Sequence, residues 1–233
     1  MKTAKPGMMK MKRIPEPELM DSPEQVDAYA GADFDEPNRL FTETLLMQFG
    51  ADLPESANLL DLGCGPGDIC VRLARALPGW RLTGLDAGPN MLERARKRIK
   101  AEGLEDRIEL VLARLPDHGL SGRGHTMIVS NSLLHHLPDP MSLWKSLPEL
   151  AGPETRVQIM DLMRPESASA ARALVKTHAA GEPDILREDF HNSLLAAWRP
   201  GEVREQLREA GIKGLEVFDF TSRHWIARGT IRR

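Results

Sequence analysis

The chain has 233 residues, 41% of them hydrophobic, and a formal net charge of −3. This length and apolar fraction predict one domain with a single sizeable core. The charge disfavours a nucleic-acid partner, and no apolar run approaches the roughly 18 residues that span a bilayer. The basic N-terminus lacks the apolar segment of a secretory signal, and two cysteines alone cannot form a structural zinc site. These features indicate a protein of the reducing cytosol.

Strand-like and helix-like segments alternate along the chain, which predicts an α/β fold: a mostly parallel sheet with helices on both faces. Residues 1 to about 13 are expected to be disordered, within a flexible segment of residues 1–20 that precedes a single domain with an N-terminal helical cap. The last two strands alternate and lie close together, so they predict an antiparallel pair at one edge. Strands are predicted at about 57–62, 81–85, 108–113, 126–131, 155–161, 214–220 and 223–230. Helices are predicted at about 22–30, 36–49, 68–77, 88–102, 140–150, 166–181, 184–197 and 201–210.

A glycine-rich turn follows the first predicted strand. In the segment Asp61-Leu-Gly-Cys-Gly-Pro-Gly67, glycine at every second position lets the backbone bend tightly and leaves room for a ligand. A dinucleotide site would place its third glycine at position 68, where Asp68 lies, and a P-loop would end in Gly-Lys-Ser/Thr. NAD, FAD, ATP and GTP are therefore disfavoured, and a plain structural turn remains the alternative.

Asp86 ends the second predicted strand, 19 residues after Gly67. This spacing is close to that of an acid that binds ribose one βα unit later. A carboxylate can accept hydrogen bonds from both hydroxyls of a cis-diol. The alternative is that Asp86 caps the following helix.

These two motifs resemble those of the class I S-adenosylmethionine-dependent methyltransferases, whose first motif is Asp/Glu-x-Gly-x-Gly-x-Gly. The resemblance covers about residues 20 to 230. It implies a seven-stranded sheet whose seventh strand is inserted antiparallel, S-adenosylmethionine as the cofactor, and methyl transfer by in-line displacement. It also implies that the glycines approach the cofactor closely, that Asp61 contacts its methionine end and that Asp86 binds ribose. The cofactor-binding residues that we predict are Asp61, Gly63, Gly65, Gly67, Asp86, Ala113, Arg114, Asn131 and Ser132.

The segment after the third predicted strand departs from the family. Many relatives carry an acid there that holds the adenine amino group, whereas this chain has Ala113 and Arg114. We expect backbone groups of these residues, or stacking by Arg114, to contact adenine. Arg114 as a solvated loop residue is the alternative.

The loop Asn131-Ser-Leu-Leu-His-His-Leu137 resembles one found in small-molecule members of the family, which makes Asn131, Ser132 and His135 pocket candidates. His135 is a candidate general base, since histidine titrates near neutral pH, and a structural histidine is the alternative. No metal is predicted, because consecutive side chains usually diverge and no carboxylate or cysteine pattern completes a site with His136.

Two charged residues follow the fifth predicted strand. Asp161 is a candidate to orient a nucleophile or accept its proton, and Arg164 is a candidate to bind an anionic substrate group. An Asp161–Arg164 ion pair that holds the loop is the alternative. The resemblance further implies a helical lid at about 165–200 that covers the substrate.

Tyr29 is the only tyrosine in the chain, and comparable enzymes often carry a tyrosine in this helix that closes over the cofactor. We assign Tyr29 a catalytic role and Phe34 a substrate-binding role in the roof of the active site, with Asp33 and Arg39 as weaker candidates. A tyrosine that only packs at a helix surface is the alternative.

Three functions fit the sequence. The first is methyl transfer to a small-molecule acceptor, the second is modification of tRNA or other RNA, and the third is non-catalytic binding of S-adenosylmethionine. The RNA hypothesis depends on arginines near the C-terminus, but glutamates alternate with them, which is typical of a mixed solvated surface. The acceptor and the oligomeric state stay open.

Overall fold

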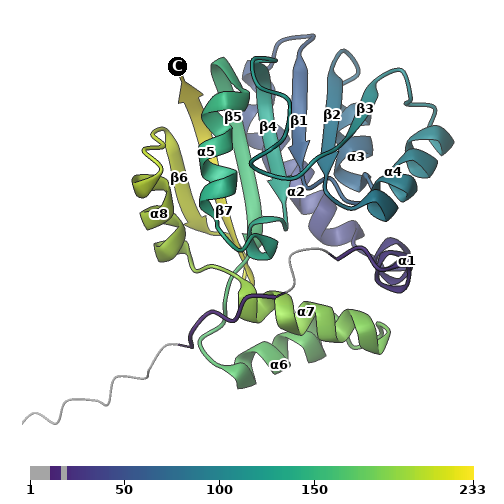
Figure 1. Cartoon of the computed structure of the whole chain (residues 1–233), viewed down its shortest axis with the longest axis vertical. Helices are drawn as coiled ribbons and strands as arrows, with labels where there is room; N and C mark the ends of the chain where they lie inside the picture. The colour runs from purple at the N-terminus through teal and green to yellow at the C-terminus, as the bar shows by residue number, and fades with distance from the viewer. Residues whose placement is uncertain (1–10, 17–19) are drawn as a thin grey trace, which may run out of the picture.

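The computed structural model describes residues 11–16 and 20–233, and this part of the chain forms a seven-stranded sheet with helices on both faces (Figure 1). The strands are β1 Asn58–Leu62, β2 Arg81–Asp86, β3 Ile108–Leu112, β4 His125–Asn131, β5 Ala151–Leu162, β6 Leu215–Asp219 and β7 His224–Arg232. The helices are α1 Pro23–Gly31, α2 Asp35–Phe49, α3 Asp68–Ala76, α4 Pro89–Ala101, α5 Met141–Leu150, α6 Ala168–His178, α7 Asp184–Ala196 and α8 Pro200–Glu209. Two short 3₁₀ turns are η1 Gly50–Asp52 and η2 Leu134–His136.

The strand order is β3-β2-β1-β4-β5-β7-β6. The pairs from β3 through β5 are parallel, whereas β7 pairs antiparallel with both β5 and β6. The predicted elements, the antiparallel edge pair and the inserted seventh strand are thereby confirmed. The order reverses between β1 and β4, and ligands of open α/β sheets bind beyond the carboxyl ends of the strands at such a point.

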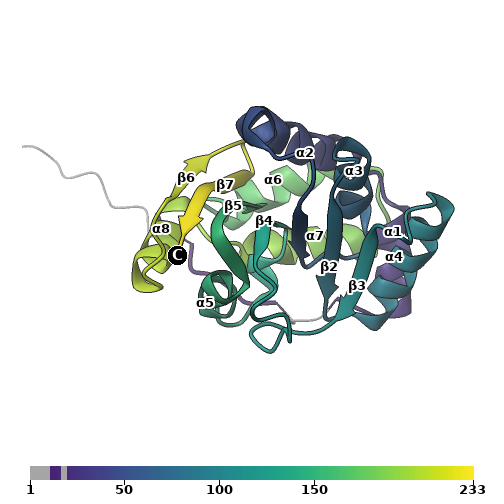
Figure 2. The ribbon, with the colours of Figure 1, turned by 90° about the horizontal axis from the view of Figure 1, so that it is seen from above.

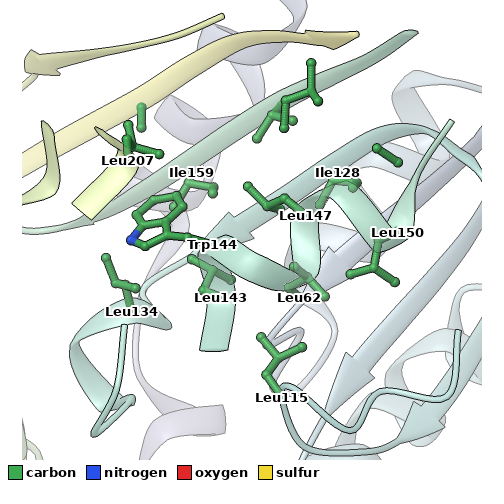
Figure 3. Close-up of a cluster of buried hydrophobic side chains, with 14 of the residues drawn as sticks. Leu62, Leu115, Ile128, Leu134, Leu143, Trp144, Leu147, Leu150, Ile159 and Leu207 are labelled. Atoms are coloured by element: carbon green, nitrogen blue, oxygen red, sulfur yellow. The ribbon is translucent and has the colours of Figure 1, made fainter. Parts of the chain in front are cut away.

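Two apolar layers hold the sheet between its helices. On one face, side chains of α5 and α8 pack on the sheet around Trp144, whose indole Nε1 donates to Gln206 Oε1 at 2.9 Å (Figure 3). The helices α2, α3 and α4 cover the other face (Figure 2). They bury residues such as Phe41, Leu73 and Leu92 against it. Each such fully buried side chain contributes about 1.5–3 kcal/mol to folding. These layers fix the strand ends that carry the site.

The helices α1, α6 and α7 lie beyond the carboxyl ends of the parallel strands (Figure 1). Ser22 caps α1 by accepting from the Gln25 backbone N–H, and Ser167 caps α6 by accepting from that of Ala170. No helix of the described residues combines the length and the apolar character needed to cross a membrane. The cover over the strand ends is therefore built from short helices, two of which, α1 and α6, begin at a serine cap.

The segment of residues 11–16 lies against α7 and η2. The Arg13 guanidinium donates to the carbonyls of Ala196 and His135 and stacks 4.2 Å from the Trp198 ring centroid. The expectation of disorder to about residue 13, within a flexible segment of residues 1–20, is wrong for this part. The physical reason is that Arg13 satisfies loop carbonyls that lie far away in sequence. Residues 1–10 and 17–19, to which the same expectation applied, lie outside the described part.

Candidate active site

A cavity of about 430 Å³ opens at the carboxyl ends of the strands. It extends from the glycine turn after β1 to the segment that carries α6 and α7. A second cavity of about 200 Å³ lies next to it and contacts Asp61, Asp68 and Arg72. Of the predicted site residues, the larger cavity brings together Tyr29, Asp33, Phe34, Gly63, Gly65, Asp86, Ala113, Arg114, Asn131, Ser132 and His135.

The glycine turn forms the floor of both cavities. Gly63 has a φ of +72°, and a Cβ there would lie 2.8 Å from Leu133 Cδ1. Gly65 has a φ of +51°, and a Cβ there would meet no heavy atom within 4 Å, so the space above it is open to a ligand. Both positions require a left-handed backbone that glycine adopts without strain.

Asp86 lies beside this turn at the end of β2. Its Oδ2 accepts from the Gly65 backbone N–H and its Oδ1 from that of Gly88, each at 2.8 Å. Burial raises the pKa of Asp86, and these two hydrogen bonds partly oppose the rise. Each carboxylate oxygen keeps a lone pair for a ligand hydroxyl.

The helix α4 after Asp86 receives its cap from another residue. Asp21 Oδ1 accepts from the backbone N–H groups of Asn90 and Met91, at 3.0 and 3.1 Å. The alternative that Asp86 caps this helix is therefore wrong, since Asp21, from the segment before α1, binds the free N–H groups. Asp86 remains available at the cavity wall.

Asp61 is buried and faces the smaller cavity. Burial raises its pKa to about 7, although the Cys70 thiol donates to Asp61 Oδ2 at 3.2 Å and opposes the rise. A carboxyl group with this pKa carries a proton for much of the range below neutral pH. A cationic ligand group in the smaller cavity would favour its ionised form.

His135 and Asp161 form a buried pair. His135 Nδ1 lies 2.5 Å from Asp161 Oδ1, and the His135 backbone N–H donates to Asp161 Oδ2 at 3.1 Å. Burial alone would raise the pKa of Asp161, but the nearby His135 outweighs it and the net shift is downward. The ionised carboxylate accepts from Nδ1, which leaves Nε2 as the nitrogen that faces outward from the pair.

Glu16 completes a cluster with the adjacent histidines of η2. Glu16 Oε1 lies 3.6 Å from His135 Nε2 and 3.1 Å from His136 Nδ1, and the two imidazole centroids are 4.1 Å apart. The expectations that the consecutive histidine side chains diverge and that no carboxylate joins them are both wrong. The 3₁₀ turn holds the rings together, and the carboxylate comes from a segment far earlier in the chain. These three residues have the donor atoms and spacing that could hold a metal ion.

The comparison with known proteins identifies the family. A family model described as a methyltransferase domain matches residues 59–154. An uncharacterized methyltransferase of Mycobacterium tuberculosis is 26% identical over 151 residues, which cover 64% of this chain and 73% of the relative. A ubiquinone biosynthesis O-methyltransferase of Vibrio cholerae is 30% identical over 175 residues, covering 70% of this chain and 66% of the relative.

A solved structure extends this likeness to the fold. The plantazolicin methyltransferase BpumL, in complex with S-adenosylhomocysteine, superposes with a TM-score of 0.71 at 14% identity, over 91% of each chain. The chain belongs to the class I S-adenosylmethionine-dependent methyltransferases. Its cofactor is S-adenosylmethionine.

Three predicted cofactor-binding residues of this methyltransferase have a local geometry that the sequence did not predict. Gly67 is buried at the start of α3 and lines neither cavity, because its place against Ala95 is a helix-to-helix contact. The Ala113 backbone N–H donates to the Asp86 carbonyl at 3.0 Å, so it is not available to adenine. Ser132 has a φ of 60°, a strained conformation for a non-glycine residue at the cavity wall.

Arg164 lies outside the cavity of the methyltransferase. Its guanidinium donates to Glu202 Oε1 at 2.5 Å, to the Ala197 carbonyl at 2.8 Å and to the Met11 carbonyl at 3.1 Å. The predicted binding of an anionic substrate group does not fit this placement, and the alternative ion pair with Asp161 is wrong because Asp161 pairs with His135. Arg164 joins the end of β5 to α8.

Tyr29 and Phe34 lie in the roof of the methyltransferase cavity, with ring centroids 4.5 Å apart. Burial raises the pKa of Tyr29 to about 12, and the nearby carboxylates Asp68, Asp86 and Asp161 add to the rise. Its phenol therefore stays neutral at physiological pH and can donate a hydrogen bond. Arg39, a weaker candidate, pairs instead with Glu43 on the exposed face of α2.

Sequence reasoning missed several lining residues. Arg223, in the turn between β6 and β7, and His224, at the start of β7, line the cavity, as do Asp189 and Ser193 of α7. Burial lowers the pKa of His224 to about 4. A signal was present: the antiparallel pairing of β7 with β5 puts the first residues of β7 beside the carboxyl end of β5, where Leu162 is opposite His224.

Proposed function

We propose that this methyltransferase transfers the methyl group of S-adenosylmethionine to a small-molecule acceptor bound between the glycine turn and the α6–α7 segment. The observation that carries the proposal is the continuous cavity of about 430 Å³, which joins Asp86 and Gly65 to His135 and α7. Cavities of this size and mixed lining suit small molecules. The Vibrio cholerae relative, named as an O-methyltransferase of ubiquinone biosynthesis, supports this class of acceptor.

The cofactor half of the site fits the parts of S-adenosylmethionine. Asp86 offers two oxygens to the ribose hydroxyls, and the open space above Gly65 admits the ligand at van der Waals distance. Asn131 Oδ1 is buried and has no hydrogen-bond partner among the described residues, so it can accept from the cofactor's amino group. Asp61 faces the smaller cavity, which supports its assignment to the same cationic end. Arg114 lines the cavity next to Ala113 and is assigned to the adenine side.

The acceptor half supplies alignment and excludes water. Bound S-adenosylmethionine supplies an electrophilic methyl group, so orientation and desolvation provide much of the acceleration. His135 is the catalytic residue in contact with the acceptor, and Asp161 is a positioning residue that fixes its ring. Tyr29 donates from the roof, and Phe34 gives the acceptor an apolar contact.

The domain organisation follows from this division. Residues 21–233 act as one domain, in which α1 caps the cofactor and residues 165–200 form a lid over the acceptor. Gln25 on α1 donates to Asp189 on α7 at 3.2 Å, which joins the cap to the lid. Leu194 and Ala197 anchor the lid to Leu162 at the end of β5.

The alternative of an RNA acceptor has little support from the surface. The C-terminal arginines bind neighbouring groups: Arg208 pairs with Glu205, Arg232 with Glu154, and Arg204 donates to a backbone carbonyl. Paired charges of this kind do not form a track for phosphates. These contacts therefore favour a small-molecule acceptor over an RNA acceptor.

The test begins with calorimetric titration of S-adenosylmethionine and S-adenosylhomocysteine into wild type and Asp86→Ala. The exposed Asp106→Asn variant is the matched control. Binding to wild type and the control, weakened at least 100-fold in Asp86→Ala, is the expected result, since two charge-assisted hydrogen bonds are lost.

The acceptor class is tested separately with methyl-labelled cofactor, a metabolite extract and total tRNA. Label in a small molecule that depends on Asp86 supports the proposal. Label found only in tRNA would show that the acceptor is RNA and not a small molecule. Cofactor binding without transfer to any acceptor would favour the non-catalytic alternative.

A further inference from the structure

The geometry points to a binding site for one divalent transition-metal ion of the zinc class, formed by Glu16, His135 and His136 at the wall of the larger cavity. One ligand atom from each of the three residues lies within 4.8 Å of the other two. The three residues come from two segments that meet only in the folded chain: residues 11–16 and η2. This site goes beyond the proposed methyl transfer, and its existence does not depend on that proposal.

The distances are compatible with ligands that share one ion. Two atoms that each lie about 2.0–2.2 Å from one ion are roughly 3 to 3.6 Å apart at tetrahedral or octahedral angles. Glu16 Oε1 is 3.1 Å from His136 Nδ1 and 3.6 Å from His135 Nε2. Within the described chain, His136 Nδ1 is a buried atom without a hydrogen-bond partner, which an ion would satisfy.

A second layer of contacts orients the ligands. Asp161 accepts from His135 Nδ1, which presents Nε2 in the form that binds a metal. Histidine ligands of metals nearly always donate their other ring N–H in this way. The Ser193 hydroxyl donates to the Glu16 carboxylate at 3.2 Å and holds it toward the histidines.

The local charge is compatible with a divalent cation. The carboxylates of Glu16 and Asp161 face the cluster, and the Arg13 guanidinium, bound to the His135 carbonyl, opposes them with one positive charge. A set of two imidazoles and one carboxylate is typical of zinc sites that keep an open position. Both histidines line the cavity, so that position faces it, and an oxygen-bearing acceptor would be the class of ligand to fill it. This last step rests on the proposed function, and with the ion bound His135 would act on the acceptor through the metal instead of by direct contact.

The test uses untagged, chelator-treated protein titrated with Co²⁺ alone and read by visible absorption, followed by displacement with Zn²⁺. Wild type is expected to bind one ion per chain. Glu16→Gln and His136→Ala are expected to weaken binding at least tenfold, and Asp161→Asn by about 10- to 100-fold through loss of ligand orientation. The matched controls Glu182→Gln and His178→Ala change the same residue types in the same cavity and are expected to bind like wild type.

Two results would overturn the site: no saturable Co²⁺ absorption in wild type, or Glu16→Gln and His136→Ala binding as tightly as the controls. Glu16→His separates coordination from a simple ion pair, because it keeps a donor atom and should retain Co²⁺ binding. The melting temperature of each metal-free variant checks that the fold is intact. Titration of metal-free wild type with S-adenosylmethionine tests the cofactor site separately. Cofactor binding without metal binding would overturn the metal site and leave the proposed function standing.

Discussion

The two halves of the cavity are built in different ways. The cofactor half consists of backbone N–H groups, glycines and the carboxylates of Asp61 and Asp86 from consecutive βα units, so that Gly65 and Asp86 meet through a hydrogen bond across neighbouring strands. The acceptor half draws Glu16, His135, Asp189 and Arg223 from four segments far apart in the chain. The first half is local in sequence, whereas the second exists only once the cover has packed onto the sheet.

The largest expected effect concerns Asp61 in the cofactor half. A rise in the pKa of Asp61 from 3.8 in the unfolded chain to about 7 in the folded protein changes the free energy of unfolding by about 4 kcal/mol between low and high pH. Because the folded-state pKa is the higher one, the folded protein holds an extra proton: this stabilisation is complete below about pH 4 and is lost as pH rises through 7.

Asp61→Asn should therefore reduce the loss of unfolding free energy between pH 4 and 8. The measurement is urea unfolding across this range, with the exposed Asp52→Asn as control. An unchanged pH dependence in Asp61→Asn would show that Asp61 ionises normally in the folded chain.

The second prediction asks whether a larger residue in the glycine turn is disfavoured by steric contact or by the backbone conformation. Gly63→Ala should lower the free energy of unfolding by about 3 kcal/mol, because it adds a clash with Leu133 to the strain of a positive φ. Gly122→Ala, at a φ of +80° with nothing within 4 Å, carries the strain alone and should cost about 1 kcal/mol. Denaturant titration of both variants measures the difference. Equal losses would mean that Leu133 moves aside.

A third, smaller effect concerns Arg164, which the sequence assigned to the acceptor half. Arg164→Gln should cost about 2 kcal/mol of stability, since it removes the buried partner of the half-exposed Glu202. Binding of S-adenosylmethionine should stay as in wild type. Thermal unfolding and calorimetry check the two statements, and a variant of normal stability with altered acceptor KM would restore the predicted substrate role.

The contrast between the halves also explains what the sequence could predict. The alternation of strands and helices, the turn at Gly63 and Gly65 and the place of Asp86 at a strand end follow from local patterns, and the structure puts both glycines and Asp86 at one cavity. The metal-type cluster could not be predicted, because no spacing links Glu16 to His135. Arg164 follows β5 directly, yet its guanidinium binds carbonyls and a carboxylate at the base of the lid, which only tertiary packing decides.

Tyr29 lines both cavities and so lies at the junction of the two halves. Tyr29→Phe removes one hydrogen-bond donor and should cost about 1 kcal/mol, roughly a fivefold loss. With a pKa of about 12, the phenol stays neutral between pH 6 and 9, so the loss should not change across this range. A loss seen in the affinity for S-adenosylmethionine by calorimetry would place Tyr29 with the cofactor half, and a loss in kcat of labelled methyl transfer with the acceptor half. A loss that grows as pH rises would contradict the neutral donor and indicate that the phenolate takes part in the reaction.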